Sequence, residues 1–136
     1  MVNARRPSSR RGFTLIELLV VMAIIATLLA LVGPKYFSSL KRSQETVLRT
    51  NLRITRDAID KFRGDTGRYP ASLQELVDQR YLRELPMDPV TERNDSWVLL
   101  GPPGTDSGTM AAPAVLYDLR SGAAGMAADG TSYGSW

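Results

Sequence analysis

The chain has 136 residues, which is enough for one small domain and one membrane-spanning helix. It contains no histidine and no cysteine, which excludes histidine-based catalytic triads, histidine-containing zinc sites and disulfide bonds. Four of its 17 basic residues lie before Phe13, so the remainder has 13 basic and 14 acidic residues. The chain after residue 12 therefore lacks the positive charge on which nucleic-acid binding depends.

Residues 13–32 form an almost wholly apolar run in which Glu17 is the only charged residue. As a helix this run rises about 30 Å, which matches the hydrocarbon core of a bilayer. The arginines before it predict a cytoplasmic N-terminus and an exported C-terminal part. A carboxylate inside such a helix costs about 2.5–3.5 kcal/mol, so Glu17 is a candidate functional residue. Protonation, or extension of the side chain toward the headgroups, is the simpler alternative.

A plain signal anchor or a cleavable secretory signal is another interpretation of this N-terminus. An ordinary secretory signal has a shorter apolar core and a small-residue cleavage site, and either kind normally lacks an acidic residue early in the core. The pairs Arg5-Arg6 and Arg10-Arg11 are weak evidence for a twin-arginine address, because such pairs are common in basic leaders.

The sequence predicts one helix of about fifty residues, apolar all round at first and amphipathic later. Pro34 predicts a kink or local melting, because proline lacks an amide hydrogen and clashes with the preceding turn. From Lys35 to about Arg63 the helix has an apolar face, and Gly64 and Gly67 signal its end. The apolar face holds Leu48, Leu52, Ile59 and Phe62. The opposite face, expected to be solvated, holds Lys41, Arg42, Glu45, Arg49, Arg53, Arg56, Asp57 and Lys61.

The rest of the chain predicts a small α+β head. Ser72 and Glu75 fit a capping box for a short helix that ends near Arg80. The two prolines in residues 85–89 predict an extended loop, and two strands are expected at residues 97–100 and 115–119. A loop rich in Gly, Pro, Ser and Thr separates the strands, and the segment after Ser121 is rich in Gly and Ala.

Two regions of the chain resemble one protein family. Residues 12–20, GFTLIELLV, resemble the class III signal of type IV pilins and type II secretion pseudopilins. A second, narrower set resembles the major pseudopilin of type II secretion, the G subunit. This set is Tyr69-Pro70, Leu73, Leu76, Tyr81-Leu82, Leu85-Pro86, Asp88-Pro89, Tyr117-Asp118, Ser121-Gly122 and Asp129-Gly130. Val90-Thr91 depart from the family, which usually has Trp-Gly after Asp-Pro.

The resemblance implies a type IV pilin-like α+β fold, in which a long N-terminal helix carries a small head of one short helix and antiparallel strands. Residues 1–12 are then a basic leader that is cleaved off. Residues 13–34 form the transmembrane and assembly helix, and residues 35–64 the amphipathic half of the long helix. Residues 65–136 form the periplasmic head.

The resemblance also implies processing and assembly residues near the N-terminus. In the family a membrane peptidase cuts after the glycine and methylates the new amine, which places the cut between Gly12 and Phe13. Glu17, one helical turn further on, can then pair with the amine of its own chain or with that of a neighbouring subunit. The family's staggered bundle of helices favours the neighbour, and that pair sets the register of the filament. Melting near Pro34 lets the family's helix stretch as subunits pack, and an ordinary kink is the alternative.

A calcium site in the C-terminal loop is a further expectation from the family. Asp118, Ser121 and Asp129, together with backbone carbonyls, are the candidate ligands. Calcium takes about six to eight oxygen ligands. This loop is poorer in carboxylates than the family's, so the alternative is that Asp129-Gly130 simply forms a turn.

The expected function is that of a structural subunit, not an enzyme, in a type II secretion pseudopilus of the bacterial inner membrane. Expected partners are further copies, other pseudopilins, prepilin peptidase and the inner-membrane secretion platform, and polymerisation drives export of folded proteins across the outer membrane. A type IV pilin or minor pilin for adhesion, motility or DNA uptake is the main alternative. Many such pilins carry a C-terminal cysteine pair, which this chain lacks.

Two alternatives from other classes fit less well. A membrane-anchored periplasmic enzyme needs reactive groups, and no nucleophile–base pair, phosphate loop or metal-binding motif stands out in the sequence. A periplasmic binding domain released by cleavage near Gly33 is the second alternative, but it does not explain the acidic Glu17 in the apolar run.

Overall fold

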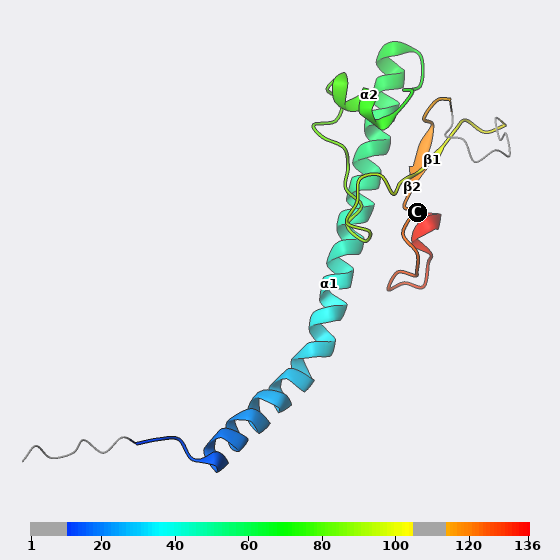
Figure 1. The fold of residues 1–136 in the computed structure, drawn as a ribbon. Helices are drawn as coiled ribbons and strands as arrows, with labels where there is room; N and C mark the ends of the chain where they lie inside the picture. Colours follow the sequence, from blue (N-terminus) through cyan, green and yellow to red (C-terminus); the bar gives the residue numbers. More distant parts are fainter. Residues whose placement is uncertain (1–10, 105–113) are drawn as a thin grey trace, which may run out of the picture. The chain divides into compact units, whose positions relative to one another are not determined.

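A computed structural model describes residues 11–104 and 114–136. In chain order these residues form helix α1 (Leu15–Thr66), helix α2 (Leu73–Asp78), strands β1 (Val98–Leu100) and β2 (Asp118–Arg120), and the short 3-10 helix η1 (Tyr133–Ser135) (Figure 1). The predicted α+β class is confirmed. Residues 1–10 of the predicted leader and residues 105–113 of the predicted loop lie outside the described residues.

Helix α1 is a single helix of 52 residues that contains Pro34. The residues on both sides of Pro34 keep helical backbone, so the helix shows no local melting there. Proline removes one amide donor, and the rest of the hydrogen-bond ladder carries the helix past it. The helix also continues through Gly64, and Gly67 with a φ of 75° supplies the left-handed residue that ends it.

The chain divides into two compact units between Ser38 and Ser39. In the described part of the first unit, almost every large apolar side chain of α1 is exposed, from Leu15 to Phe37. An 18-residue window of α1 has a mean hydropathy of 2.9, so the helix is long and apolar enough to cross a membrane. A surface that is apolar all round needs lipid or other helices around it.

The second unit has its own hydrophobic core. Leu48, Leu52, Ile59 and Phe62 of α1 are buried, which confirms the apolar face expected from their spacing. The remainder of the core comes from α2, the strands and the C-terminal segment: Leu73, Leu76, Leu82, Trp97, Leu116, Leu119, Ala123, Ala127 and Tyr133. The head therefore uses the second half of α1 as one wall of its core.

Helix α2 begins with the predicted cap. The Ser72 hydroxyl accepts a hydrogen bond from the Glu75 amide at 3.2 Å. The Glu75 carboxylate accepts one from the Ala71 amide at 2.6 Å, so both residues satisfy amides at the start of the helix. The helix ends at Asp78 rather than near Arg80, because Arg80 adopts a left-handed backbone with a φ of 63°.

Strands β1 and β2 form an antiparallel pair in which Leu99 lies opposite Leu119. The second strand begins at Asp118, later than the sequence predicted. The reason is a competing bond: the Leu116 amide donates to the Pro70 carbonyl at 2.7 Å and not to a strand. Leu116 is thereby tied to the segment before α2, whereas the Tyr117 amide still donates to the Leu100 carbonyl of β1 at 2.8 Å.

The segment after β2 passes very close to the chain before β1. A Cβ built on Gly122 would lie 1.9 Å from the Ser96 carbonyl oxygen, so only glycine fits at this position. Further on, the predicted Asp129-Gly130 turn is present: the Gly130 amide donates to the Ala127 carbonyl at 3.1 Å, and Gly130 has a φ of 83°.

Candidate processing and assembly site

The start of α1 is fixed by a cap built from two residues of the GFTLIELLV motif. The Thr14 hydroxyl accepts a hydrogen bond from the Glu17 amide at 3.2 Å, and the Thr14 carbonyl accepts the first helical bond, from Leu18, at 3.2 Å. Thr14 is thus the N-cap and Glu17 the third helical residue, the spacing of a capping box. The spacing of Thr14 and Glu17 in the sequence predicts this cap, although our sequence analysis did not identify it.

Glu17 lies in the first turn of α1, and its side chain is exposed. Within the described residues its carboxylate has no hydrogen-bonding or ion-pairing partner. A negative charge in the first helical turn is favoured by the helix dipole. The carboxylate is therefore available to a cation close to the N-terminus of the helix.

Gly12 and Phe13 precede the helix and contact little of their own chain. Phe13 is 87% exposed. A Cβ built on Gly12 would meet no atom within 4 Å, and Gly12 does not require a positive φ. Packing among the described residues therefore gives no reason for a glycine at this position.

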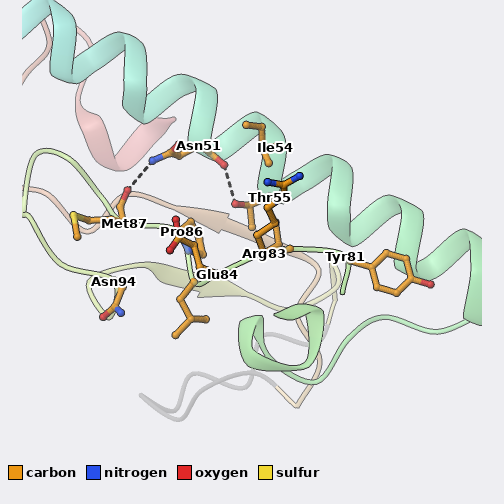
Figure 2. A pocket seen from close by; sticks show the side chains of 11 residues that line it. Asn51, Ile54, Thr55, Tyr81, Arg83, Glu84, Pro86, Met87 and Asn94 are labelled. Carbon is orange, nitrogen blue, oxygen red and sulfur yellow. Dashed lines mark hydrogen bonds between the residues drawn. The ribbon is translucent and has the colours of Figure 1, made fainter. Parts of the chain in front are cut away.

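A groove of about 750 Å³ opens on the second unit between α1 and residues 81–87. Figure 2 shows that Asn51, Ile54 and Thr55 reach into it from α1. The Asn51 amide donates to the Met87 carbonyl at 2.8 Å, and the Thr55 hydroxyl donates to the Asn51 carbonyl at 2.8 Å. These polar groups are used for structure, so the groove offers a surface and no reactive pair.

Tyr81 lies at one end of this groove (Figure 2). Its hydroxyl donates to the Asp65 carboxylate at 2.8 Å, and this bond raises the pKa of Tyr81. The raised pKa keeps the phenol protonated at neutral pH, so Tyr81 is not an activated nucleophile.

The three residues predicted to hold calcium are bound to other side chains. Asp118 accepts a hydrogen bond from Arg56, and Asp129 accepts one from Arg49. The Ser121 hydroxyl donates to Asp88, which is fully buried. Among residues 11–104 and 114–136, no group of three or more acidic, histidine or cysteine side chains is placed to hold a metal. The donors present therefore do not fit a calcium site.

Part of the charged face of α1 contacts the C-terminal segment of the same chain. Lys41, Glu45, Arg49 and Arg56 all bond to the C-terminal segment, residues 118–136. Our sequence analysis missed these contacts because they join residues that lie more than sixty positions apart. The spacing of the four residues places them on one side of the helix. This shared side is the one feature of the sequence that indicates a common binding partner.

Comparison with known proteins gives one matching motif and several relatives. The prokaryotic N-terminal methylation motif matches residues 7–33. The type II secretion system core protein G of Klebsiella michiganensis is 30% identical over 100 residues, which cover 62% of this chain and 70% of that protein. The protein of the same name from Pseudomonas aeruginosa is 33% identical over 94 residues, which cover 57% and 66%.

A relative that is a type IV pilin aligns with a smaller part of this chain. The type IV major pilin protein PilA of Myxococcus xanthus is 38% identical over 66 residues, which cover 48% of this chain and 30% of the pilin. No solved structure matches the chain. The resemblance read from residues 12–20 and from the head is supported by these relatives, and the long helix with a small head has the type IV pilin-like arrangement.

Proposed function

Since the chain belongs to the family of the type II secretion system core protein G and is a structural subunit of a pseudopilus, we propose how it is processed and assembled. A prepilin peptidase cuts between Gly12 and Phe13, and the new amine of Phe13 is methylated. The subunit then joins other copies and other pseudopilins on the inner-membrane secretion platform. Growth of the filament drives folded proteins across the outer membrane, and the chain's role is structural rather than catalytic.

The start of α1 is the observation that carries this proposal. Glu17 is a lone carboxylate in an apolar helix and has no partner among the described residues. Pairing with the amine of a neighbouring Phe13 offsets the cost of placing both charges in an apolar bundle. A subunit docked at another height leaves both charges unpaired, so the pair selects one register.

The apolar half of α1 anchors the subunit in the inner membrane. We propose that the N-terminus faces the cytoplasm, because Arg5, Arg6, Arg10 and Arg11 precede the apolar run. The head then lies in the periplasm. Pro34 removes one backbone hydrogen bond from α1, and we propose that this weakened turn lets the helix stretch during assembly.

Deletion of the gene tests the proposal. We expect exoproteins to accumulate in the periplasm while surface pili and twitching stay intact, and a plasmid copy of the gene should restore secretion. Normal secretion with lost pili or DNA uptake would contradict a role in secretion. The similarity to the Myxococcus pilin makes type IV pilus assembly the second candidate, and this second outcome would support it.

A further inference from the structure

Two side chains of α1 hold the middle of the C-terminal segment. The Lys41 ammonium donates to the Met126 carbonyl at 2.8 Å. One oxygen of the buried Glu45 carboxylate accepts from the Ala128 amide at 2.9 Å and from the Tyr133 hydroxyl at 3.1 Å. Burial and the bond to Glu45 raise the pKa of Tyr133, so the phenol stays protonated and keeps donating. The helix thus supplies both a cation and an anion to one loop.

Arg49 binds the tip of the same segment. Its guanidinium donates to the Asp129 carboxylate at 2.6 Å and lies 4.0 Å from the centre of the Trp136 ring. The Thr131 hydroxyl links these two partners, because it donates to Asp129 at 2.6 Å and accepts from the Trp136 indole at 2.7 Å. Bonds from Thr131 and from Arg49 lower the pKa of Asp129 to about 2.

Arg56 binds the start of the segment. Its Nε donates to the Asp118 carboxylate at 2.7 Å, and its Nη2 donates to the Leu119 carbonyl at 2.9 Å. Next to it, the Ser121 hydroxyl donates to the buried Asp88 carboxylate at 2.5 Å. Asp118 and Asp129, the two carboxylates predicted to bind calcium, are thus each paired with an arginine. The Ser121 hydroxyl, the third predicted ligand, donates its hydrogen bond to Asp88.

This arrangement leaves calcium without suitable ligands. A calcium ion needs carboxylate oxygens that are free to coordinate it. Here one oxygen of each carboxylate, Oδ2 of Asp129 and Oδ1 of Asp118, accepts a charge-assisted hydrogen bond from an arginine. Each guanidinium group would also repel a divalent cation at the carboxylate that it binds.

We propose that Lys41, Glu45, Arg49 and Arg56 take the place of a calcium ion in this head and hold the C-terminal segment without any divalent metal. The four side chains provide fixed charges where the family uses a bound ion. The inference concerns the stability of the head alone, so it does not depend on the proposed role in secretion.

Thermal unfolding of the full chain in detergent tests the inference. The fluorescence of Trp97, which is buried in the head, and of Trp136 reports on unfolding of the head. We expect the same midpoint in EDTA and in millimolar calcium chloride. Equilibrium dialysis with radioactive calcium should detect less than one bound ion per chain. A higher midpoint in calcium, or one tightly bound ion, would overturn the inference.

Arg49→Met tests the role of the arginine. It should lower the midpoint by about 4 °C in both EDTA and calcium. Arg53→Met is the matched control: Arg53 lies one turn further along α1, and its side chain has no hydrogen bond or ion pair with any described residue. This variant should therefore melt like the parent. An unchanged midpoint for Arg49→Met would contradict the role given to Arg49.

A double-mutant cycle tests whether Arg49 and Asp129 act as a pair. Asp129→Asn removes the partner carboxylate, and the double variant with Arg49→Met should lose less than the sum of the two single losses. Additive losses would show that the two side chains do not act as a pair. If Asp129 were a calcium ligand, Asn at this position would lower the midpoint only when calcium is present, and that result would also overturn the inference.

Discussion

The two halves of α1 are one helix but are stabilised in opposite ways. In the first half nearly every large apolar side chain is exposed, and Glu17 is the only charge from Leu15 to Pro34. In the second half Leu48, Ile59 and their neighbours are buried in the head's own core. The first half therefore depends on lipid and on neighbouring subunits, whereas the second half depends on its own chain. We expect substitutions in the first half to affect assembly and those in the second half to affect folding.

Gly12→Leu should have the largest effect of the variants considered. A bulky side chain at the cleavage position should block the peptidase, so we expect no processed subunit, no filaments and unchanged melting of the head. Intact mass and N-terminal sequencing measure the processing. Gly33→Ala is the control, since a Cβ there also meets no atom within 4 Å, and this variant should be processed normally. A product that begins at Phe13 in the Gly12→Leu strain would contradict the proposed cleavage site.

Glu17→Val should leave the subunit in the membrane and lower filament yield by more than about tenfold, because the neighbour's amine is left buried without a partner. Filament yield is measured by immunoblot of sheared fractions, and the melting of the head should not change. Thr27→Val is the control: within the described part of the chain, the Thr27 hydroxyl donates to the Ala23 carbonyl of its own helix, at 2.8 Å, and to no other residue. Normal filament yield for Glu17→Val would argue against pairing between subunits.

Phe62→Ala tests the other half of the comparison. Phe62 is buried and packs edge-on against Tyr81, with ring centres 5.3 Å apart, so its truncation should cost about 3–5 kcal/mol of the free energy of unfolding. Denaturant titration followed by tryptophan fluorescence measures this loss. Val47→Ala, at an exposed position of the same helix, should cost far less. Equal losses for the two variants would contradict the view that the head alone buries this half.

Asp88→Ala should destabilise the head by about 1–3 kcal/mol for each buried donor that loses its acceptor. The carboxylate accepts from the Val90 amide at 2.8 Å, from the Thr91 amide at 3.3 Å and from the Ser121 hydroxyl, and all three donors lose this acceptor in the variant. Asp88→Asn keeps an acceptor oxygen and should recover part of the loss. The same denaturant titration checks both variants. Equal stability of Asp88→Ala and the parent would contradict the view that the Asp88 carboxylate stabilises the head as a hydrogen-bond acceptor.

The acid stability of the head should show the smallest effect. The pKa of Asp129 is lowered to about 2 in the folded chain, below its usual value of about 3.9. The ionised form therefore stabilises the fold above about pH 4, and that contribution is lost as the pH falls toward 2. Asp129→Asn should show a flatter loss of stability over this range, as measured by thermal melts at several pH values. Parallel curves of melting temperature against pH for Asp129→Asn and the parent would contradict the lowered pKa of Asp129.

The sequence predicted most of α1 because its signals are local. The apolar run from Phe13, the spacing of Leu48, Leu52 and Phe62, and the cap at Ser72 each depend on residues only a few positions apart. The start of β2 was wrong because the Leu116 amide bonds to the distant Pro70 carbonyl. A pattern along the chain does not contain such a pairing.

The charged face of α1 shows the same limit for the candidate sites. Periodicity identified Glu45 and Arg49 as polar positions, and solvation was the natural expectation. Their partners Ala128 and Asp129 follow some eighty residues later, so only the folded chain brings them together. The calcium prediction has the same limit, because it considered the oxygen ligands of the C-terminal segment without the arginines that bind them.

The contact between Glu45 and Tyr133 also sets the order of events during synthesis. The two residues lie 88 positions apart, and both are buried when they meet. Helix α1 is therefore synthesised long before Tyr133. Until Tyr133 is added, the apolar face of the helix lacks this covering side chain. A head that has not yet received Tyr133 therefore exposes part of its apolar wall, and exposed apolar surface of this kind is prone to aggregation.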